Sequence, residues 1–224
     1  MVDNIFSPTA SRVIRCLLVN IGKNWTIREL AKEANTSVGY THAIIATLER
    51  MEYVVRTEEL KLALMNPLTL IRRWAAHRDY NYVNDFLDYY TFDNEIESVF
   101  HTFERNLKNE DYSVTSLAGA WLVSGYVRPI DIHLYIKNRK DAERISQLLD
   151  IKPTAGKGNI RMVIPDDSGV FYGSRIIQGV KVVSNIQLFV DLQSYPTRGE
   201  EAAQNLYNSI EKRWIEHSTG ELHV

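Results

Sequence analysis

Two short helical patterns separated by a brief turn constrain the fold of this chain more than any other feature. In the stretch WTIRELAKEA, Thr26 followed three residues later by Glu29 forms a capping box, and apolar residues follow at helical spacing. Asn35 and Thr36 make the turn, and Ser37 can cap a second helix. The buried face of that helix is predicted to consist of Thr41, Ile44, Ile45, Leu48 and Met51. The spacing is that of a helix-turn-helix.

Segments on either side extend this pattern. Upstream, Ser7-Pro8 offers a helix start, and an apolar stripe at helical spacing stops at Gly22. Downstream, YVV is predicted to form a strand, and the alternating leucines of LKLAL predict a second strand after the polar tip TEE. Helix, helix, turn, helix, hairpin is the order of a winged helix-turn-helix, so we expect this fold at the N-terminus.

The stretch SVGYTHAIIATLERMEYVVR resembles the third helix and wing strand of many prokaryotic winged-helix regulators. In those proteins a Gly-Tyr or equivalent pair precedes a buried position, and a Leu-Glu pair precedes the wing. The chain departs from them at several positions. Ala43 and Thr47 stand where basic residues are common, and Glu52 stands where a glycine is common. Glu58 and Glu59 at the wing tip would repel phosphate.

A DNA-contacting surface on this third helix has to rely mostly on small and uncharged polar side chains. Hydroxyls and imidazole nitrogens can donate to phosphates or base edges, and an Ala or Thr methyl can contact a thymine methyl. Arg28 and Lys32 on the preceding helix, and Arg12 and Arg15 on the first helix, are candidate phosphate anchors. The alternative is that the third helix only packs or binds protein. The candidate DNA-binding positions on it are Ser37, Gly39, Tyr40, His42, Ala43, Ala46, Thr47 and Arg50.

The charge distribution divides the chain into regions. A net charge of −2 over 224 residues argues against a general nucleic-acid binder. Residues 1–80 carry 11 Lys and Arg against 8 Asp and Glu, whereas residues 81–112 carry 2 against 8. This asymmetry permits DNA binding at the N-terminus without requiring it. We predict a winged helix-turn-helix at residues 1–66, an acidic, aromatic-rich connecting segment at 67–111 and an α+β domain at 112–224.

The C-terminal region alternates helical and strand patterns. YSVTSLAGAWLVSGYV predicts a helix, RPIDIHLYI a strand, and Lys140 to Leu149 a second helix. Four strands are predicted in GKGNIRMVIP, GVFYG, GVKVVS and NIQLFVDLQ, and a last helix is predicted from Thr197 to Trp214. The tyrosine-rich stretch from Tyr80 to Phe92 favours a further strand. These patterns together indicate an α+β fold class.

The C-terminal order resembles a minimal nucleotidyltransferase fold. In that superfamily a small-residue motif at a helix start, an Asp-x-Asp strand and a third carboxylate hold two divalent metals that clamp nucleotide phosphates. Ser116 to Gly119 is a loose version of the first motif, Asp131 and His133 stand at the second, and Asp191 could be the third. His133 cannot supply the hard anionic oxygen that Mg²⁺ prefers, so we predict an inactive domain without catalytic residues, metal or cofactor. A metal-dependent nucleotidyltransferase using Asp131 and Asp191 is the alternative.

Both halves together resemble the AbiEi-type antitoxins of type IV toxin-antitoxin systems. The residues that carry the resemblance are Ser184, Asn185, Gln187, Asp191 and Leu192, with Gly158-Asn159 upstream and Arg198-Gly199-Glu200-Glu201-Ala202 downstream. The resemblance implies a DNA-binding repressor that controls its own operon and opposes a nucleotidyltransferase-type toxin without stable contact. Arg198 and Gly199 at a helix start could bind a phosphate or carboxylate, although an ion pair of Arg198 with Asp191 or Asp150 is the simpler explanation.

The predicted regulator would have double-stranded DNA as its partner. We expect a homodimer, because regulators usually read two half-sites. No apolar run approaches the roughly 20 residues of a membrane span, and no charged-then-apolar leader precedes Asn4, so we expect a cytoplasmic protein that does not enter a membrane. A winged-helix scaffold that binds protein is the main alternative.

Overall fold

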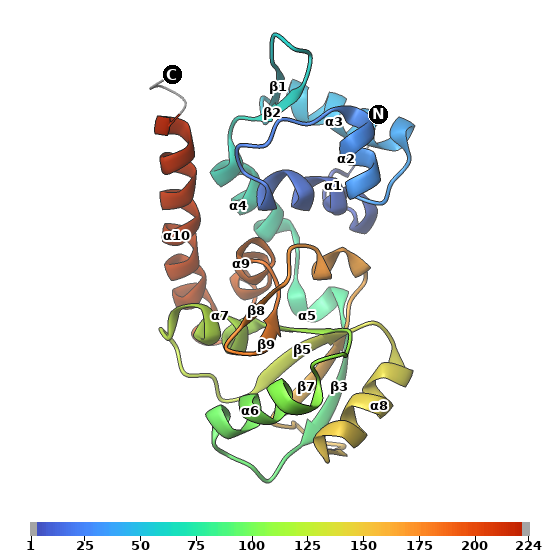
Figure 1. Cartoon of the computed structure of the whole chain (residues 1–224), viewed down its shortest axis with the longest axis vertical. Helices are drawn as coiled ribbons and strands as arrows, with labels where there is room; N and C mark the ends of the chain where they lie inside the picture. Colours follow the sequence, from blue (N-terminus) through green and yellow to red (C-terminus); the bar gives the residue numbers. More distant parts are fainter. Residues whose placement is uncertain (1–3, 221–224) are drawn as a thin grey trace.

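The computed structural model describes residues 4–220, which combine α-helices with β-sheets as predicted. The N-terminal part, coloured blue to cyan at the top of Figure 1, consists of three helices followed by a two-stranded antiparallel hairpin. This is the predicted order of elements. They are α1 (Pro8–Val19), α2 (Ile27–Glu33), α3 (Val38–Arg50), β1 (Val54–Arg56) and β2 (Leu62–Leu64).

The ends of α2 and α3 follow from local sequence. The predicted capping box is confirmed: the Thr26 hydroxyl accepts from the backbone N–H of Glu29, and the Glu29 carboxylate accepts from the backbone N–H of Thr26. Ser37 caps α3 by accepting from the backbone N–H of Tyr40. Between the helices, Asn35 has a φ of 49°, a left-handed conformation that Asn tolerates better than most residues. Side chains thus fix both sides of the α2–α3 turn.

The hairpin is joined to the helices through Trp25. Its backbone N–H and C=O pair with Leu62 in β2 at 2.9 and 2.7 Å, and its indole is buried. Just after α3, Glu52 has a φ of 60°. This is the position where similar regulators commonly have glycine, and a Cβ in this left-handed region crowds the following carbonyl oxygen.

The C-terminal part is built on a seven-stranded sheet within residues 4–220. Its strand order is β6-β3-β7-β5-β4-β9-β8. β5 pairs in parallel with β7, and β4 with β9, whereas the other neighbouring strands are antiparallel. The strands are β3 (Asp85–Tyr90), β4 (Tyr112–Thr115), β5 (Ile132–Ile136), β6 (Lys152–Pro153), β7 (Ile160–Ile164), β8 (Arg175–Ile177) and β9 (Val180–Val182).

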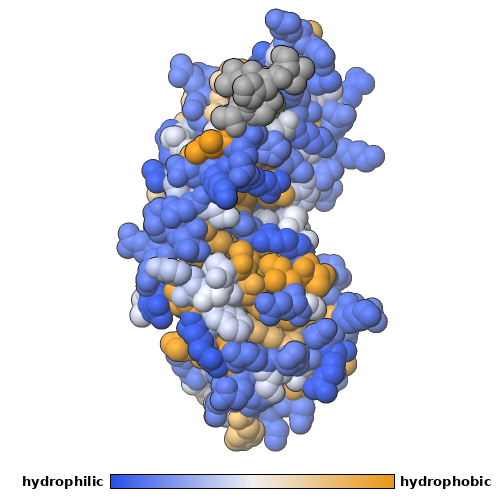
Figure 2. Space-filling model, turned by 60° about the vertical axis from the view of Figure 1, so that its left-hand side comes forward, coloured by the Kyte–Doolittle hydropathy of each residue, from blue (hydrophilic) through white to orange (hydrophobic). Residues whose placement is uncertain are grey.

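Helices cover both faces of this sheet (Figure 1). α6 and α8 pack against one face, and α9 packs against the other with α7 beside it. α10 packs along α9 and then extends beside the N-terminal helices. Seen from the α10 side, the surface of the upper part is mostly hydrophilic, and a hydrophobic patch lies near mid-height (Figure 2). The helices are α4 (Pro67–His77), α5 (Tyr80–Val83), α6 (Ile96–Asn106), α7 (Ser116–Ser124), α8 (Arg139–Leu149), α9 (Asn185–Gln193) and α10 (Gly199–Gly220).

α9 lies where the N-terminal and C-terminal parts meet. It contacts α1 and α4 from the N-terminal side, and α7, α10 and β4 from the C-terminal side. Residues 186–192 are all buried, and Ser184 caps the helix by accepting from the backbone N–H of Gln187. The prediction of a strand in NIQLFVDLQ is therefore wrong. Apart from Gln187 and Asp191, which lie one turn apart, the buried residues of α9 are apolar all round, so the helical period is weak and the sequence resembles a buried strand.

Three other predicted elements differ from the structure. The segment predicted as a helix from Tyr112 begins with β4, and only the part from Ser116 onward is helical. GVFYG is not a strand but part of the 3₁₀ turn η1 (Ser168–Phe171), capped by Asp167. The tyrosine-rich stretch contains α5 before β3. In each case aromatic and small apolar residues suit either type of structure, and packing against the rest of the fold decides.

Candidate nucleic-acid interface

The outward face of α3 carries most of the predicted DNA-contacting positions. Gly39, His42 and Arg50 are exposed, and Tyr40 and Ala43 are half-buried. A Cβ built at Gly39 would meet nothing within 4 Å, so a ligand can approach the backbone there. α3 lies beside the hairpin at the end of the molecule farthest from α6 and α8 (Figure 1). This end is therefore accessible to a large partner.

Thr47 does not belong to this face. Its side chain is 6% exposed, and its hydroxyl donates to the carbonyl oxygen of Ala43 at 3.1 Å. The expectation that it points outward is wrong, because position 47 lies one turn after the buried Ile44 on the same stripe. Its hydroxyl is occupied within the helix.

The basic residues of α1 and α2 have different environments. Arg28 and Lys32 on α2 are exposed, as a phosphate anchor must be. Arg12, in contrast, forms an ion pair of 2.6 Å with Asp167, and Arg15 is fully buried. The prediction that these α1 arginines anchor the phosphates of DNA is wrong, because Asp167 pairs with Arg12 and the C-terminal part covers Arg15.

The cations of the hairpin are paired with neighbouring carboxylates. Arg56 lies 2.9 Å from Glu49, and Lys61 lies 2.6 Å from Glu59. All four side chains are partly or largely exposed, so each pair is weak and screened by salt. The hairpin therefore offers little net positive charge to phosphate.

Two of the positions suggested by the nucleotidyltransferase resemblance, Asp131 and His133, lie in a buried polar cluster. Asp131 accepts from the Tyr195 hydroxyl at 2.8 Å and lies 3.4 Å from the Lys157 ammonium. His133 Nδ1 lies 2.9 Å from the Tyr80 hydroxyl, and its Nε2 lies 3.7 Å from Asp131. Burial lowers the pKa of His133. Burial also raises the pKa of Asp131, but His133, the Tyr195 hydroxyl and Lys157 outweigh it and hold that pKa below its usual range.

Asp191 lies on α9 and not on a strand. Its carboxylate is fully buried and accepts from the Thr115 hydroxyl at 2.6 Å, the Tyr135 hydroxyl at 3.0 Å and the Gln187 amide at 2.7 Å. Burial raises the pKa of Asp191, against the opposing charge of Arg78. With three donors around it, this carboxylate is satisfied by the protein itself.

The remaining predicted positions are spread over the C-terminal part. Ser116 is buried at the start of α7 with a φ of 54°, and Gly119 packs against Leu188 and the backbone of β4. Arg198 is exposed and lies 3.4 Å from Glu201, so the expected ion pair with Asp191 or Asp150 is wrong. Gly199 is buried at the start of α10. Among residues 4–220, no group of three or more His, Cys, Asp or Glu side chains is arranged to hold a metal ion.

A buried polar chain that was not predicted from the sequence links α1 and α9. Arg15 Nε donates to the side-chain oxygen of Gln187 at 3.0 Å, and the Gln187 amide donates to Asp191 at 2.7 Å. The Arg15 guanidinium also lies 5.0 Å from the centre of the Trp74 ring. The available signal was an arginine inside the apolar run VIRCLLV, since a charge on a buried stripe needs a polar partner elsewhere in the fold.

Gln187, one of the α9 residues that carry the AbiEi resemblance, thus bonds to α1 and to Asp191. A family model described as transcriptional regulator, AbiEi antitoxin, type IV toxin-antitoxin system matches residues 63–212. The chain belongs to this family. The AbiEi match begins in β2 and ends within α10, so it includes the buried chain around Asp191, whereas α1, α2 and α3 lie outside it.

The other comparisons give no relative. No curated protein and no solved structure matches this AbiEi-family chain. Within residues 4–220, no helix combines the length and apolar character that crossing a membrane requires.

Proposed function

We propose that this AbiEi-family protein is a DNA-binding transcriptional regulator whose N-terminal part acts as a winged helix-turn-helix. The observation that carries the proposal is the exposed face of α3, which follows a capped turn and precedes a hairpin, in a chain that belongs to a family of transcriptional regulators. In helix-turn-helix proteins the second helix lies in the major groove, with its N-terminal residues against base edges. α3 corresponds to that helix.

Small and polar side chains of α3 would make the base contacts. Gly39 and Ala43 allow the helix to approach the groove closely, and an alanine methyl can contact a thymine methyl. Tyr40 and His42 would donate to base edges or phosphates, with Arg28 and Lys32 of α2 holding the backbone. Few cations are involved, so the affinity should be modest and salt-sensitive. Ser37 and Arg50 lie at the two ends of α3, where the sugar-phosphate backbone would pass.

We extend the proposal to autoregulation and to the toxin. An antitoxin of this type would repress its own operon and oppose a nucleotidyltransferase-type toxin without stable contact. Its C-terminal part would then be a nucleotidyltransferase-like domain without activity. The internal pairing of Asp131 and Asp191 supports this, because neither carboxylate is free to hold a metal. A homodimer would place two copies of α3 on adjacent half-sites.

Fluorescence anisotropy with a duplex from upstream of the gene tests the proposal. Wild-type protein should bind this duplex more tightly than an unrelated duplex of equal length, and Tyr40→Ala should weaken binding at least about fivefold, as loss of a base-edge contact of about 1–3 kcal/mol implies. The matched control is Tyr126→Ala, which removes a tyrosine that is 51% exposed in the C-terminal part. Absence of binding by the wild type at low salt would refute the proposal.

One observation favours a second candidate function. The hairpin cations are paired, and its tip carries two glutamates, Glu58 and Glu59, so this wing suits a basic protein surface better than phosphate. A scaffold that binds protein would retain its partner in the Tyr40→Ala variant, whose DNA binding is weakened. Pull-down with the Tyr40→Ala variant and with a Glu58→Lys, Glu59→Lys variant separates the two functions.

A further inference from the structure

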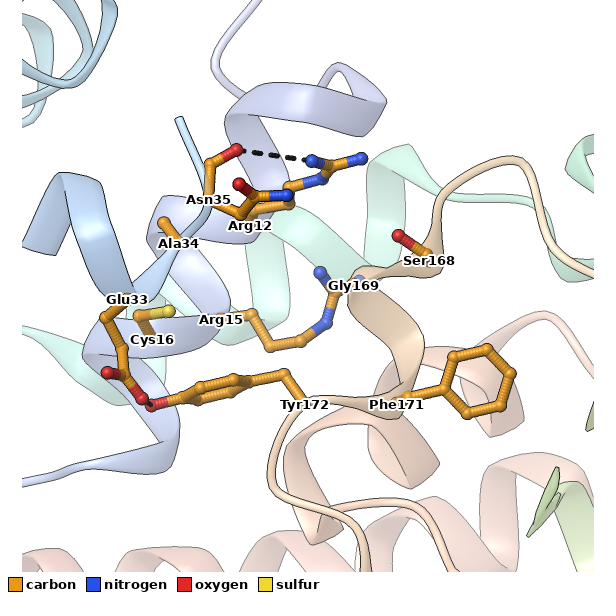
Figure 3. Close-up of a pocket in the computed structure, with 10 residues that line it drawn as sticks. All are labelled: Arg12, Arg15, Cys16, Glu33, Ala34, Asn35, Ser168, Gly169, Phe171 and Tyr172. Atoms are coloured by element: carbon orange, nitrogen blue, oxygen red, sulfur yellow. Dashed lines mark hydrogen bonds between the residues drawn. The ribbon is translucent and has the colours of Figure 1, made fainter. Parts of the chain in front are cut away.

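A pocket of about 310 Å³ lies where the N-terminal and C-terminal parts meet (Figure 3). One wall is α1, which contributes Arg12 and Arg15. A second wall is the turn between α2 and α3, at Asn35, and a third is the η1 segment, at Gly169 and Tyr172. The pocket therefore borders both the C-terminal part and the turn that leads into α3.

The pocket wall contains a buried guanidinium that forms no ion pair within residues 4–220, although the charges of Asp167 and Asp191 act on it from a distance. Arg15 is fully buried, and its only hydrogen bond within residues 4–220 goes from Nε to the neutral side-chain oxygen of Gln187. Nη1 and Nη2 have no hydrogen-bond partner there. Burial lowers the pKa of Arg15 to about 10, which leaves it charged at neutral pH. Because buried donors without partners are costly, an anion that accepts hydrogen bonds from Nη1 and Nη2 would be stabilised there.

The covering of this guanidinium is thin. In Figure 3 the Arg15 side chain crosses the pocket wall toward Ser168 and Gly169. A Cβ at Gly169 would collide with Arg15 Nη1, so the η1 backbone packs directly on the guanidinium. Nη1 therefore lies directly beneath the η1 backbone, and an anion reaches it only when this backbone shifts.

Arg12 is a second cation in the pocket, and it bonds to both the C-terminal part and the α2–α3 turn. Its side chain is 24% exposed, pairs with Asp167 at 2.6 Å and donates to the Asn35 carbonyl at 3.3 Å. It therefore links the segment before η1 to the α2–α3 turn. An anion in the pocket would compete with Asp167 and the Asn35 carbonyl for this guanidinium, and so would alter the connection to α3.

The rest of the pocket indicates the kind of anion. Cys16, Ala34 and Phe171 form an apolar wall. At the end near α2, Glu33 accepts from the Tyr172 hydroxyl at 2.7 Å, and its charge disfavours a polyanion. A volume near 310 Å³ is at the small end of ligand sites, which are mostly apolar with a few fixed polar groups.

We propose that this pocket binds a small organic anion, with one carboxylate or phosphate group on an apolar body, and that Arg15 and Arg12 bind its charge. We further propose that the bound anion changes the DNA affinity of α3 through the α2–α3 turn. This second part rests on the proposed DNA-binding function, whereas the binding of the anion does not.

Isothermal titration calorimetry on the full chain without DNA tests the site. The probes are benzoate and phenyl phosphate, with benzamide as the neutral analogue of benzoate. At least one of the two anions should bind saturably and about tenfold or more tightly than benzamide, and the stronger one identifies the head group. If neither anion exceeds benzamide, the proposal is wrong.

Two variants examine the residues involved. Arg15→Met removes the charge while keeping the side-chain length, and Ser168→Trp fills the mouth of the pocket from an exposed position without removing a charge. Both should weaken anion binding at least about tenfold. Ser98→Trp, at an exposed position on α6, is the matched control and should bind as the wild type does. If Arg15→Met fails to fold, unchanged binding by Ser168→Trp alone overturns the site.

DNA affinity measured with and without the better probe separates the two parts of the proposal. We expect a change of at least about threefold in Kd for the upstream duplex, equivalent to a modest coupling between sites. An unchanged Kd overturns the regulatory role but not the site. Failure of the apo-protein to bind DNA refutes the proposed function, while calorimetry still decides whether the anion binds.

Discussion

Replacing Gln187 by methionine should destabilise the fold strongly, although the two side chains are similar in size. Methionine nearly keeps the volume of the side chain, so the packing of α9 is retained. Two buried hydrogen bonds are lost, one from Arg15 at 3.0 Å and one to Asp191 at 2.7 Å. Hydrogen bonds to charged groups contribute about 1.5–3 kcal/mol each, and a buried charge left unpaired adds to the loss. We expect the free energy of unfolding to fall by about 3–5 kcal/mol.

Urea unfolding followed by tryptophan fluorescence measures this loss, and thermal unfolding provides a second measure. In a protein of this size each kcal/mol shifts Tm by about 2–4 °C, so Tm should fall by roughly 6–20 °C. Gln193→Met, at the exposed end of the same helix, is the matched control and should change stability by less than about 0.5 kcal/mol. A loss below about 1 kcal/mol for Gln187→Met would refute the reasoning, because Arg15 and Asp191 would then have found other partners.

Other predictions concern backbone strain and pH. Glu52→Gly should raise the free energy of unfolding by about 1 kcal/mol, because a φ of 60° strains a residue with a Cβ. Gly125→Ala should lower the free energy of unfolding by a similar amount, because Gly125 has a φ of 66° and the new Cβ would have no atom within 4 Å. Equal stabilities of both variants and the wild type in urea would contradict this argument from backbone strain. Asp131 has a folded pKa below its unfolded value of about 3.9, so it adds stability that is present above about pH 5 and lost as the pH falls through the folded pKa. Asp131→Asn should therefore be less stable than the wild type near neutral pH and approach it in acid, and stability curves that stay parallel from pH 7 to about pH 3 would exclude this contribution.

The N-terminal elements could be predicted because their signals are local. The Thr26 and Glu29 pair, the Ser37 cap and the apolar spacing of α3 lie within a few residues of the bonds that they form. The departure at Glu52 was also visible in sequence, and the structure gives it a left-handed backbone. Local hydrogen bonds need no knowledge of the rest of the fold, so sequence was sufficient there.

The type of α9 and the partners of Arg12 and Arg15 depended on contacts between distant segments of the chain. α9 is buried on all sides and only Gln187 and Asp191 mark its helical spacing, so it resembled a strand, and Asp191 was placed on the wrong kind of element. Arg12 and Arg15 are held by Asp167 and Gln187, more than 150 residues away in sequence. The predicted boundaries at 66 and 111 stay a prediction.

Salt titrations of the upstream duplex with wild type, Lys32→Ala and Tyr40→Ala test the central claim that α2 and α3 form the DNA-binding surface. The account predicts that Lys32→Ala reduces the slope of log affinity against log salt by about 0.9, since one phosphate contact is lost. Tyr40→Ala should lower the affinity at every salt concentration and leave the slope unchanged, because a base contact releases no counterion. If both variants show the same slope and the same affinity as the wild type, α2 and α3 do not form the DNA-binding surface.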